Sequence, residues 1–217
     1  MTYTVQGTDC STWQDDNSTP QHIDFSKMLA AGAQFTFIKV SQEVWLDQDY
    51  AINWHNARLA GIPRGGYHFL SWGRPVIDQA RFFAGALKAD PGELPPVVDF
   101  EETRNCPPDA AVMLEMFCDE VERILGGRVM IYTSPGYWGA HGSILQDWLE
   151  HKLWIAHYTT NPEPRIPAPW TTWEFWQHTS QGPGPVYGCE ERYVDLNWYH
   201  GSLAEFTAEY ALTPPPP

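Results

Sequence analysis

The segment Leu94-Pro95-Pro96-Val97-Val98-Asp99-Phe100-Glu101-Glu102 indicates both a fold and the place of a functional site. Two prolines introduce a short apolar strand, and the strand ends in carboxylates. Alternate side chains along a strand share one face, so Asp99 and Glu101 should point the same way with Cα atoms about 6.6 Å apart. In a parallel barrel the carboxyl ends of the strands form the active-site rim.

Two carboxylates crowded at such a rim raise each other's proton affinity, which keeps one of them protonated near neutral pH. Glycoside hydrolysis needs this division: one acid for the leaving oxygen and one anion that faces the developing oxocarbenium ion. The same Asp-x-Glu pattern also fits two solvated carboxylates at a strand end. The motif alone leaves both interpretations open.

Apolar and β-branched runs recur on both sides of this segment. Continuous runs such as residues 35–40 suit parallel strands that are covered on both faces. We predict strands at residues 3–9, 35–40, 65–70, 96–101, 129–133, 153–157, 173–178 and 193–198. We predict helices at residues 24–32, 49–60, 76–87 and 107–124 from capping, periodicity and Gly or Pro stop signals.

After about residue 140 the pattern changes. Loops rich in Pro, Gly and Trp separate the last three predicted strands, with at most a short helix near residues 145–150. We therefore predict an α/β fold, a modified TIM-like barrel of five β/α units followed by three strands with few helices. One domain would span residues 1–210, and the Pro-rich tail 211–217 is typical of a linker stub.

Charge and composition exclude several classes of protein. The 217 residues carry 13 Lys and Arg against 27 Asp and Glu, a net charge of −14. We therefore expect neither a nucleic-acid partner nor an anionic membrane surface as a partner. No run of about 18 apolar residues predicts a membrane span, and residues 1–5 have neither the basic region nor the apolar core of a secretory signal peptide.

The aromatic content is high, with 11 Trp, 10 Tyr and 10 Phe. Such rings fit a rich core, and they also fit a surface that stacks on sugar rings. No His-Glu-x-x-His or Cys-x-x-Cys motif is present, so we predict no metal and no other cofactor. Buried free thiols are favoured for the cysteines, although one disulfide stays open; these are Cys10, Cys106, Cys118 and Cys189.

Two more carboxylates lie on the predicted first and last strands. Asp9 ends the strand at residues 3–9, and Asp195 lies within the strand at residues 193–198. A charged residue inside an apolar strand is costly unless it is paired or functional. Since the first and last strands are neighbours in a closed barrel, both carboxylates should reach the same mouth.

An ordered set of short segments resembles glycoside hydrolase family 25, the Chalaropsis-type lysozymes or muramidases. Each segment is weak by itself, and their order and spacing over roughly residues 5–200 carry the resemblance. The segments are residues 7–14 (GTDCSTWQ), 37–39 (FIK), 60–63 (AGIP), 66–69 (GYHF), 94–101 (LPPVVDFE), 131–134 (IYTS), 153–158 (LWIAHY), 176–177 (WQ) and 194–197 (VDLN).

The resemblance implies a barrel of five β/α units and three further strands. It also implies hydrolysis of the β-1,4 bond between N-acetylmuramic acid and N-acetylglucosamine in peptidoglycan. By motif, Glu101 corresponds to the general acid/base. Asp99 corresponds either to the nucleophile or to the carboxylate that orients the 2-acetamido group of the substrate, and both routes stay open. Asp9 and Asp195 match the other two carboxylates of the site, in supporting roles.

Aromatic residues on the family motifs are candidates for sugar contacts, with packing in the barrel as the alternative for each. These candidates are Tyr67, Phe69, Tyr132, Tyr158 and Trp176; for Trp176, as for Trp154, packing is favoured. Cys10 departs from the usual aliphatic residue, and we expect it to point away from the site because neighbouring strand residues face opposite ways. Residues 42–45 also depart from the family's common Thr-Glu-Gly run, so this loop is assigned no substrate contact.

We therefore predict a muramidase that acts on the bacterial cell wall. A phage endolysin released through a holin-type pore fits, as does a bacterial autolysin exported by a signal outside this sequence. The tail is compatible with a cell-wall-binding module beyond it. Two alternatives are a non-catalytic glycan-binding barrel, which would usually have lost Asp99 or Glu101, and an amidase or peptidase, which would need a metal or nucleophile motif that is missing here.

The net charge of −14 predicts how activity responds to salt. Anionic wall polymers should repel an acidic protein, and ions at about 0.1 M screen such repulsion beyond about 10 Å. We expect wall hydrolysis to become severalfold faster when NaCl rises from about 10 to about 100 mM, as followed by loss of wall turbidity. A steep fall over the same range would contradict this expectation.

Overall fold

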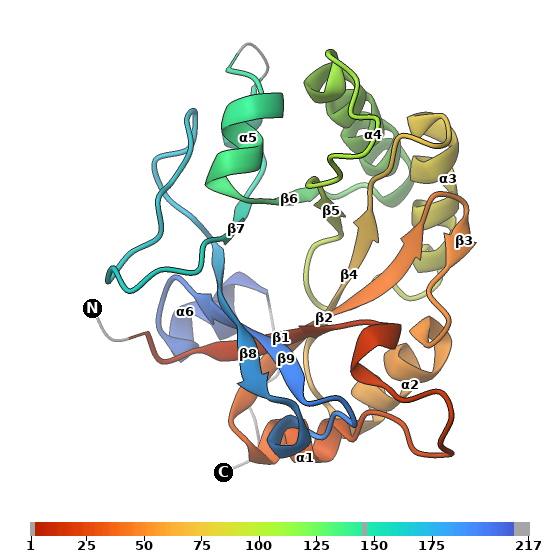
Figure 1. Ribbon diagram of the computed structural model, residues 1–217, viewed down its shortest axis with the longest axis vertical. Helices are drawn as coiled ribbons and strands as arrows, with labels where there is room; N and C mark the ends of the chain where they lie inside the picture. Colours follow the sequence, from red (N-terminus) through yellow and green to blue (C-terminus); the bar gives the residue numbers. More distant parts are fainter. Residues whose placement is uncertain (1–2, 145–146, 211–217) are drawn as a thin grey trace.

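The chain forms a barrel of strands with helices outside it, and Figure 1 shows the computed structural model, which describes residues 3–144 and 147–210. The strands are β1 (Gln6–Cys10), β2 (Ala33–Gln42), β3 (Trp45–Leu46), β4 (Arg64–Phe69), β5 (Val97–Asp99), β6 (Met130–Thr133), β7 (Leu153–Ala156), β8 (Phe175–Pro183) and β9 (Tyr193–Tyr199). The helices are α1 (Phe25–Ala30), α2 (Tyr50–Ala60), α3 (Val76–Leu87), α4 (Ala110–Leu125), α5 (Pro135–His141) and α6 (Leu203–Glu209). The Pro-rich tail at 211–217 lies outside the described residues.

Strand pairing closes the barrel. The order is β1-β9-β8-β7-β6-β5-β4-β2, β2 pairs again with β1, and β3 extends the sheet from β2. The predicted α/β barrel is therefore confirmed. Its five β/α units are β1–α1, β2–α2, β4–α3, β5–α4 and β6–α5, and the last three strands carry little helix between them.

The last strand runs against the others. β9 is antiparallel to both β1 and β8, whereas the remaining pairs around the barrel are parallel. The connection between β8 and β9 is short and contains only the 3-10 turn η3 (Gly184–Tyr187). So short a connection cannot carry the chain back to the other end of the barrel, as a parallel neighbour would require.

Several boundaries differ from the sequence-based expectation. β5 spans Val97–Asp99, so the predicted strand at 96–101 is too long at both ends; Phe100, just beyond it, packs against Tyr137 and Trp138. The fifth helix is α5, which begins with Pro135 after the Ser134 cap. The helix predicted near 145–150 lies partly outside the described residues, and the 3-10 turn η2 (Trp148–Glu150) occupies the rest.

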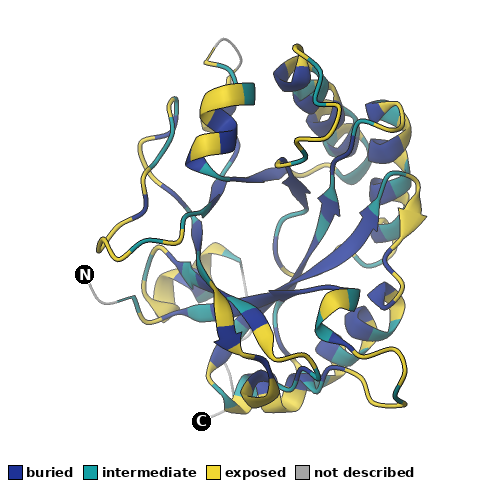
Figure 2. Ribbon diagram, in the orientation of Figure 1, coloured by how far each residue is buried: buried dark blue, intermediate teal, exposed yellow. Residues whose placement is uncertain are grey.

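Inside the barrel, side chains change from aromatic to polar along the axis. Successive inward positions of β2 hold Phe35, Phe37 and Lys39, because alternate residues share a face. The ring centroids of Phe35 and Phe175 lie 4.8 Å apart, and those of Phe37 and Trp154 lie 4.4 Å apart. The strands that enclose these rings are largely buried, as Figure 2 shows.

Helix α6 contributes to the aromatic end of this interior. Phe206 is buried, and its ring centroid lies 5.5 Å from that of Phe35 and 5.1 Å from that of Tyr199. Ser202 caps this helix in a capping box with Glu205. The packed rings leave the opposite, polar end as the open mouth of the barrel.

A second apolar layer lies between the strands and the outer helices. It includes inward faces of α2, α3 and α4 and the outward residues of the strands, such as Ile38 and Val40. Cys10 belongs to this layer, with its Sγ 3.9 Å from Thr36 Oγ1, so it points away from the barrel interior as expected. All four cysteines are free. Within the described ranges we find no helix long and apolar enough to cross a membrane.

Close packing of the barrel predicts a large difference between two glycine substitutions. A Cβ on Gly65 in β4 would lie 2.5 Å from Phe37 Cε1, whereas a Cβ on Gly85 in α3 would have no neighbour within 4 Å. We expect Gly65→Ala to lower the free energy of unfolding by about 1–3 kcal/mol. Gly85→Ala should leave it unchanged or raise it by up to about 1 kcal/mol. Urea titrations would measure both, and equal effects of the two substitutions would contradict the packing.

Candidate active site

A cleft of about 340 Å³ opens at the polar end of the barrel. All four carboxylates singled out in the sequence line it: Asp9, Asp99, Glu101 and Asp195. The other lining residues are Ser11, Trp13, Gln14, Tyr67, Tyr132, Trp154, Tyr158 and Gln177. The fold therefore collects side chains from strands that are far apart in sequence.

A larger groove of about 520 Å³ lies beside the N-terminal end of α3, with Trp72 and Met116 among its lining residues. No carboxylate lines this groove in the described part of the chain. General acid chemistry needs a titratable group within reach of the reacting bond. We therefore place the candidate active site in the smaller cleft.

Strand register brings the carboxylates together. Asp9 and Asp195 are direct partners in the antiparallel pair of β1 and β9, so the predicted proximity of the first and last strands is confirmed. Because β9 runs in the opposite direction, its beginning lies at the end where the parallel strands finish. Asp99, the last residue of β5, is opposite Phe69 on β4 and Tyr132 on β6.

Asp9 is buried and held by two amides. Its Oδ2 accepts hydrogen bonds from Gln177 Nε2 at 2.9 Å and from Asn197 Nδ2 at 2.8 Å. Burial raises the pKa of Asp9 to about 6, and these two hydrogen bonds oppose that rise because they stabilise the anion. Gln177 and Asn197 both lie within motifs of the family resemblance, but the sequence alone indicates no role for either.

The two amides are oriented by a further set of donors. Gln177 Oε1 accepts from Tyr132 Oη at 2.9 Å and from Tyr158 Oη at 2.7 Å. Asn197 Oδ1 accepts from Trp154 Nε1 at 2.7 Å. With their oxygens engaged, both amides present their N–H groups to Asp9.

The other three carboxyls also have raised pKa values. Burial raises the pKa of Asp195 to about 8, helped by the negative charges of Asp9 and Glu101. Burial raises the pKa of Asp99 well above its ordinary value, and the charge of Glu101 adds to this rise. Asp99 Oδ1 is buried without any hydrogen-bond donor among the described residues.

Glu101 lies beyond the end of β5, at the rim of the cleft, and is exposed to solvent. Its carboxyl nevertheless faces a crowded wall of protein. This partial desolvation raises the pKa of Glu101, and the charges of Asp9 and Glu102 raise it further. Glu101 is therefore both accessible to a substrate and poised to retain a proton.

The predicted sugar contacts separate into two groups. Tyr67, Tyr132 and Tyr158 line the cleft. Phe69 lies outside the lining, with its ring centroid 5.2 Å from Lys39 Nζ. Trp176 is also outside it: the ring is buried, and its Nε1 donates to the His157 carbonyl at 2.8 Å. Its contacts fit the packing alternative.

Trp13 is an exposed ring that sequence analysis did not single out. It lies on η1 (Thr12–Gln14), lines the cleft and is 75% exposed. A large exposed aromatic beside a polar cleft is typical of a sugar-binding surface. A motif search alone misses it, because its exposure depends on the fold.

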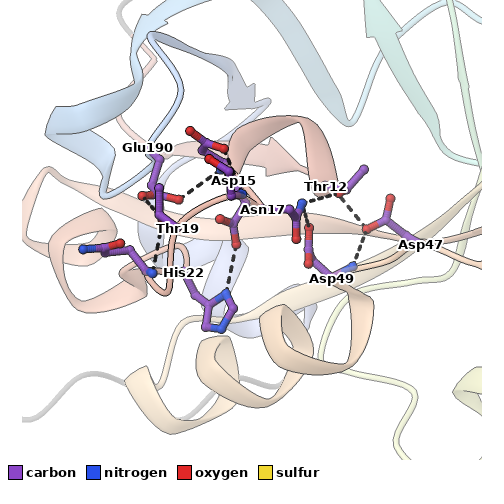
Figure 3. A network of polar contacts seen from close by, with 11 residues as sticks. Thr12, Asp15, Asn17, Thr19, His22, Asp47, Asp49 and Glu190 are labelled. Carbon is purple, nitrogen blue, oxygen red and sulfur yellow. Dashed lines mark hydrogen bonds and ion pairs between the residues drawn. The ribbon is translucent and has the colours of Figure 1, made fainter.

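The segment that carries Trp13 is anchored by polar contacts with two other parts of the chain (Figure 3). Thr12 N donates to Asp47 Oδ1 at 3.1 Å, and Asn17 Nδ2 donates to Asp49 Oδ2 at 3.1 Å. Farther along, Thr19 Oγ1 donates to Glu190 Oε1 at 2.6 Å. These contacts fix the rim of the cleft next to β1.

A metal has no evident place in this arrangement. In residues 3–144 and 147–210, no group of three or more His, Cys, Asp or Glu side chains is arranged to hold a metal ion.

Comparison with known proteins gives one family. The family described as Glycosyl hydrolases family 25 matches residues 8–186. Lysozyme M1 of Streptomyces globisporus is 31% identical over 94% of this chain and 70% of its own length. YegX of Escherichia coli strain K12 is 30% identical over 95% of this chain and 73% of its own. The crystal structure of a bacterial lysozyme from Streptomyces coelicolor superposes with a TM-score of 0.82 at 28% identity, covering 96% and 97% of the two chains.

The raised pKa of Asp195 predicts a pH-dependent effect on stability. Because this pKa is about 8 in the folded protein, folding takes up a proton, and stability is lost as the pH rises through that value. We expect Asp195→Asn to raise the melting temperature at pH 9 by about 4 °C and to change it much less at pH 4. Asp119→Asn on the exposed face of α4 is the matched control. An equal effect of Asp195→Asn at both pH values would contradict the burial of this charge.

Proposed function

The chain belongs to glycosyl hydrolase family 25, and from this premise we propose that it is a muramidase. It hydrolyses the β-1,4 bond between N-acetylmuramic acid and N-acetylglucosamine in peptidoglycan. The observation that carries the proposal is the set of four carboxylates in one cleft at the mouth of the barrel. The relatives named as lysozymes support the same activity.

Glu101 is the general acid. Its position at the rim leaves it accessible, and partial burial with the charges of Asp9 and Glu102 raises its pKa, which favours the protonated form. It donates this proton to the glycosidic oxygen as the bond from that oxygen to the anomeric carbon breaks. In the second half of the reaction the resulting carboxylate accepts a proton from the attacking water.

Asp99 supplies the anion below the sugar ring. In one route its carboxylate attacks the anomeric carbon directly. In the other it accepts a hydrogen bond from the N–H of the 2-acetamido group, whose carbonyl oxygen makes the attack. Both routes require Asp99 to be ionised, and its buried Oδ1, which lacks a protein donor in the described part of the chain, suits either role.

Asp9 and Asp195 act in support. They are partners across β1 and β9. The charge of Asp9 favours the positive charge that develops on the sugar and raises the pKa of Asp99, Glu101 and Asp195, whereas Asp195, with a pKa of about 8, retains its proton near neutral pH. Tyr67, Tyr158 and the exposed Trp13 offer ring faces and hydroxyls along the cleft for the flanking sugars.

The bacterial cell wall is where this activity takes place. Delivery through a holin-type pore or by an export signal stays a prediction from the sequence, as do the domain limits of 1–210 and 211–217 and a wall-binding module beyond the tail. The family match at residues 8–186 lies within the proposed domain.

Removing the proton of Glu101 tests the proposal. We expect Glu101→Gln to slow the release of new reducing ends from purified Gram-positive walls by about 100- to 10,000-fold, with an unchanged melting curve. Glu102→Gln is the matched control: it makes the same substitution one residue away, outside the cleft lining, and should retain most activity.

Product analysis of the wild-type protein separates the alternatives. New reducing ends at N-acetylmuramic acid support the muramidase. New amines without reducing ends would reveal an amidase or peptidase, and binding without cleavage would reveal a glycan-binding barrel. Either of the last two results would overturn the proposed function.

A further inference from the structure

Lys39 is a buried cation at the mouth of the barrel that the roles above leave unused. It is 8% exposed and occupies the inward position of β2 that follows Phe35 and Phe37. Burying an ammonium is costly unless it has a partner. Its nearest interactions therefore need an explanation.

Neutral groups hold this ammonium in place. Nζ donates to Gln42 Oε1 at 3.1 Å and lies 5.2 Å from the ring centroid of Phe69 and 5.9 Å from that of Trp45. It makes no direct ion pair with any carboxylate in the described ranges. The charge of Lys39 is thus not neutralised by contact, and the carboxylates that act on it are Asp47, Asp99 and Glu101, in that order.

The strand register directs this charge toward Asp99. Phe69 on β4 is the register partner of Gln42 on one side and of Asp99 on the other. The Phe69 ring, against which Nζ lies, therefore belongs to the strand between Lys39 and Asp99. Lys39 favours the ionised form of Asp99 and, to a lesser degree, that of Glu101.

A cation close to Asp99 bears on which of the two carboxyls, Asp99 or Glu101, holds the proton. Asp99 is 7% exposed, whereas Glu101 stands at the rim. Burial alone would leave the proton on the deeper carboxyl, Asp99, which is the reverse of what the reaction needs. No protein donor in the described residues stabilises Asp99 Oδ1 as an anion.

On the basis of the proposed function, we propose that Lys39 is a positioning residue for the hydrolysis. Its ammonium, fixed by Gln42 and the two aromatic rings, opposes the effect of burial on Asp99 and favours its ionised form, and so favours the proton on Glu101. Lys39 acts through Asp99 and does not touch the reacting atoms.

Other charged groups face this pair from several elements. Those that act on Asp99, Glu101 or Lys39 are Asp9 on β1, Asp47 before α2, Glu102 after β5 and Asp195 on β9, with the hydroxyls of Tyr67 and Tyr132 beside them. Among them, the negative charges of Asp9 and Glu102 oppose ionisation of Asp99, whereas the charge of Asp47 acts on Lys39 and favours its ammonium form. Arg165 and His157 line an adjoining hollow with Glu101, and His141 lines another. Arg165 is exposed, so solvent screens its charge far more than that of Lys39.

The pH dependence of kcat/KM tests this role, with wild type, Lys39→Met and Lys39→Arg compared between pH 4 and 9 on the same wall substrate. Loss of the cation raises the pKa of Asp99, so activity should begin at higher pH. We expect the acidic limb of the Lys39→Met profile to move up by about one pH unit, which is about a tenfold loss on that limb. Lys39→Arg keeps the charge and should restore the wild-type limb.

Two further variants keep the result interpretable. If Lys39→Met folds poorly, Lys39→Gln replaces it as the neutral variant, because its amide retains a donor toward Gln42. It should show the same upward shift of the acidic limb. Lys152→Met, which removes a cation paired with Glu174 at 2.8 Å and lying outside the cleft, should leave the limb in place. Melting curves of all variants identify any loss of fold.

An acidic limb that stays in place in both folded neutral variants, whatever the height of the profile, would overturn the role of Lys39 and leave it as a packing residue. This failure is distinct from a failure of the proposed function. In that case the wild-type protein itself would release no reducing ends, and no profile could be recorded.

Discussion

Mutual repulsion among four carboxylates at the open end of the barrel is the constraint on which the rest of this structure depends. Asp9 and Asp195 face each other across one strand pair, and Asp99 and Glu101 follow one another at the end of β5. In water these charges would be screened; inside the barrel mouth burial strengthens each interaction. The group can persist only by retaining protons, by hydrogen bonding or by a nearby cation, and it uses all three.

The fold sustains this constraint by dividing its interior. Aromatic rings from the strands and from α6 fill one end and form an apolar core there, apart from the polar mouth. At the mouth, Gln177 and Asn197 donate hydrogen bonds to Asp9, and the charge of the buried Lys39 favours the ionised form of Asp99. Because adjacent carboxyls have different partners, their proton affinities differ. One cleft can therefore hold both an acid and an anion.

The strand order and the four carboxylates could be predicted from the sequence because local patterns indicate both. Apolar runs and Gly or Pro stop signals mark the strands, and acidic residues lie where strands end. Seven-residue helices such as α5 and α6 are too short for periodicity to reveal. Nor does a pattern show strand direction, so the antiparallel β9 was missed. The exposure of Trp13, the amides around Asp9 and the position of Lys39 all depend on neighbours distant in sequence, and no local signal specifies them.

Carboxyl protonation measured on the free protein tests the central claim most directly. Following the ¹³C shifts of the Asp and Glu carboxyls by NMR between pH 3 and pH 9 would show each ionisation without a substrate. The account predicts that Glu101 ionises at a higher pH than an exposed glutamate does and that Asp195 is still largely protonated at pH 7, in line with its pKa of about 8. If every carboxyl had ionised by about pH 5, as exposed groups do, the cleft would hold no proton to donate, and the account would be wrong.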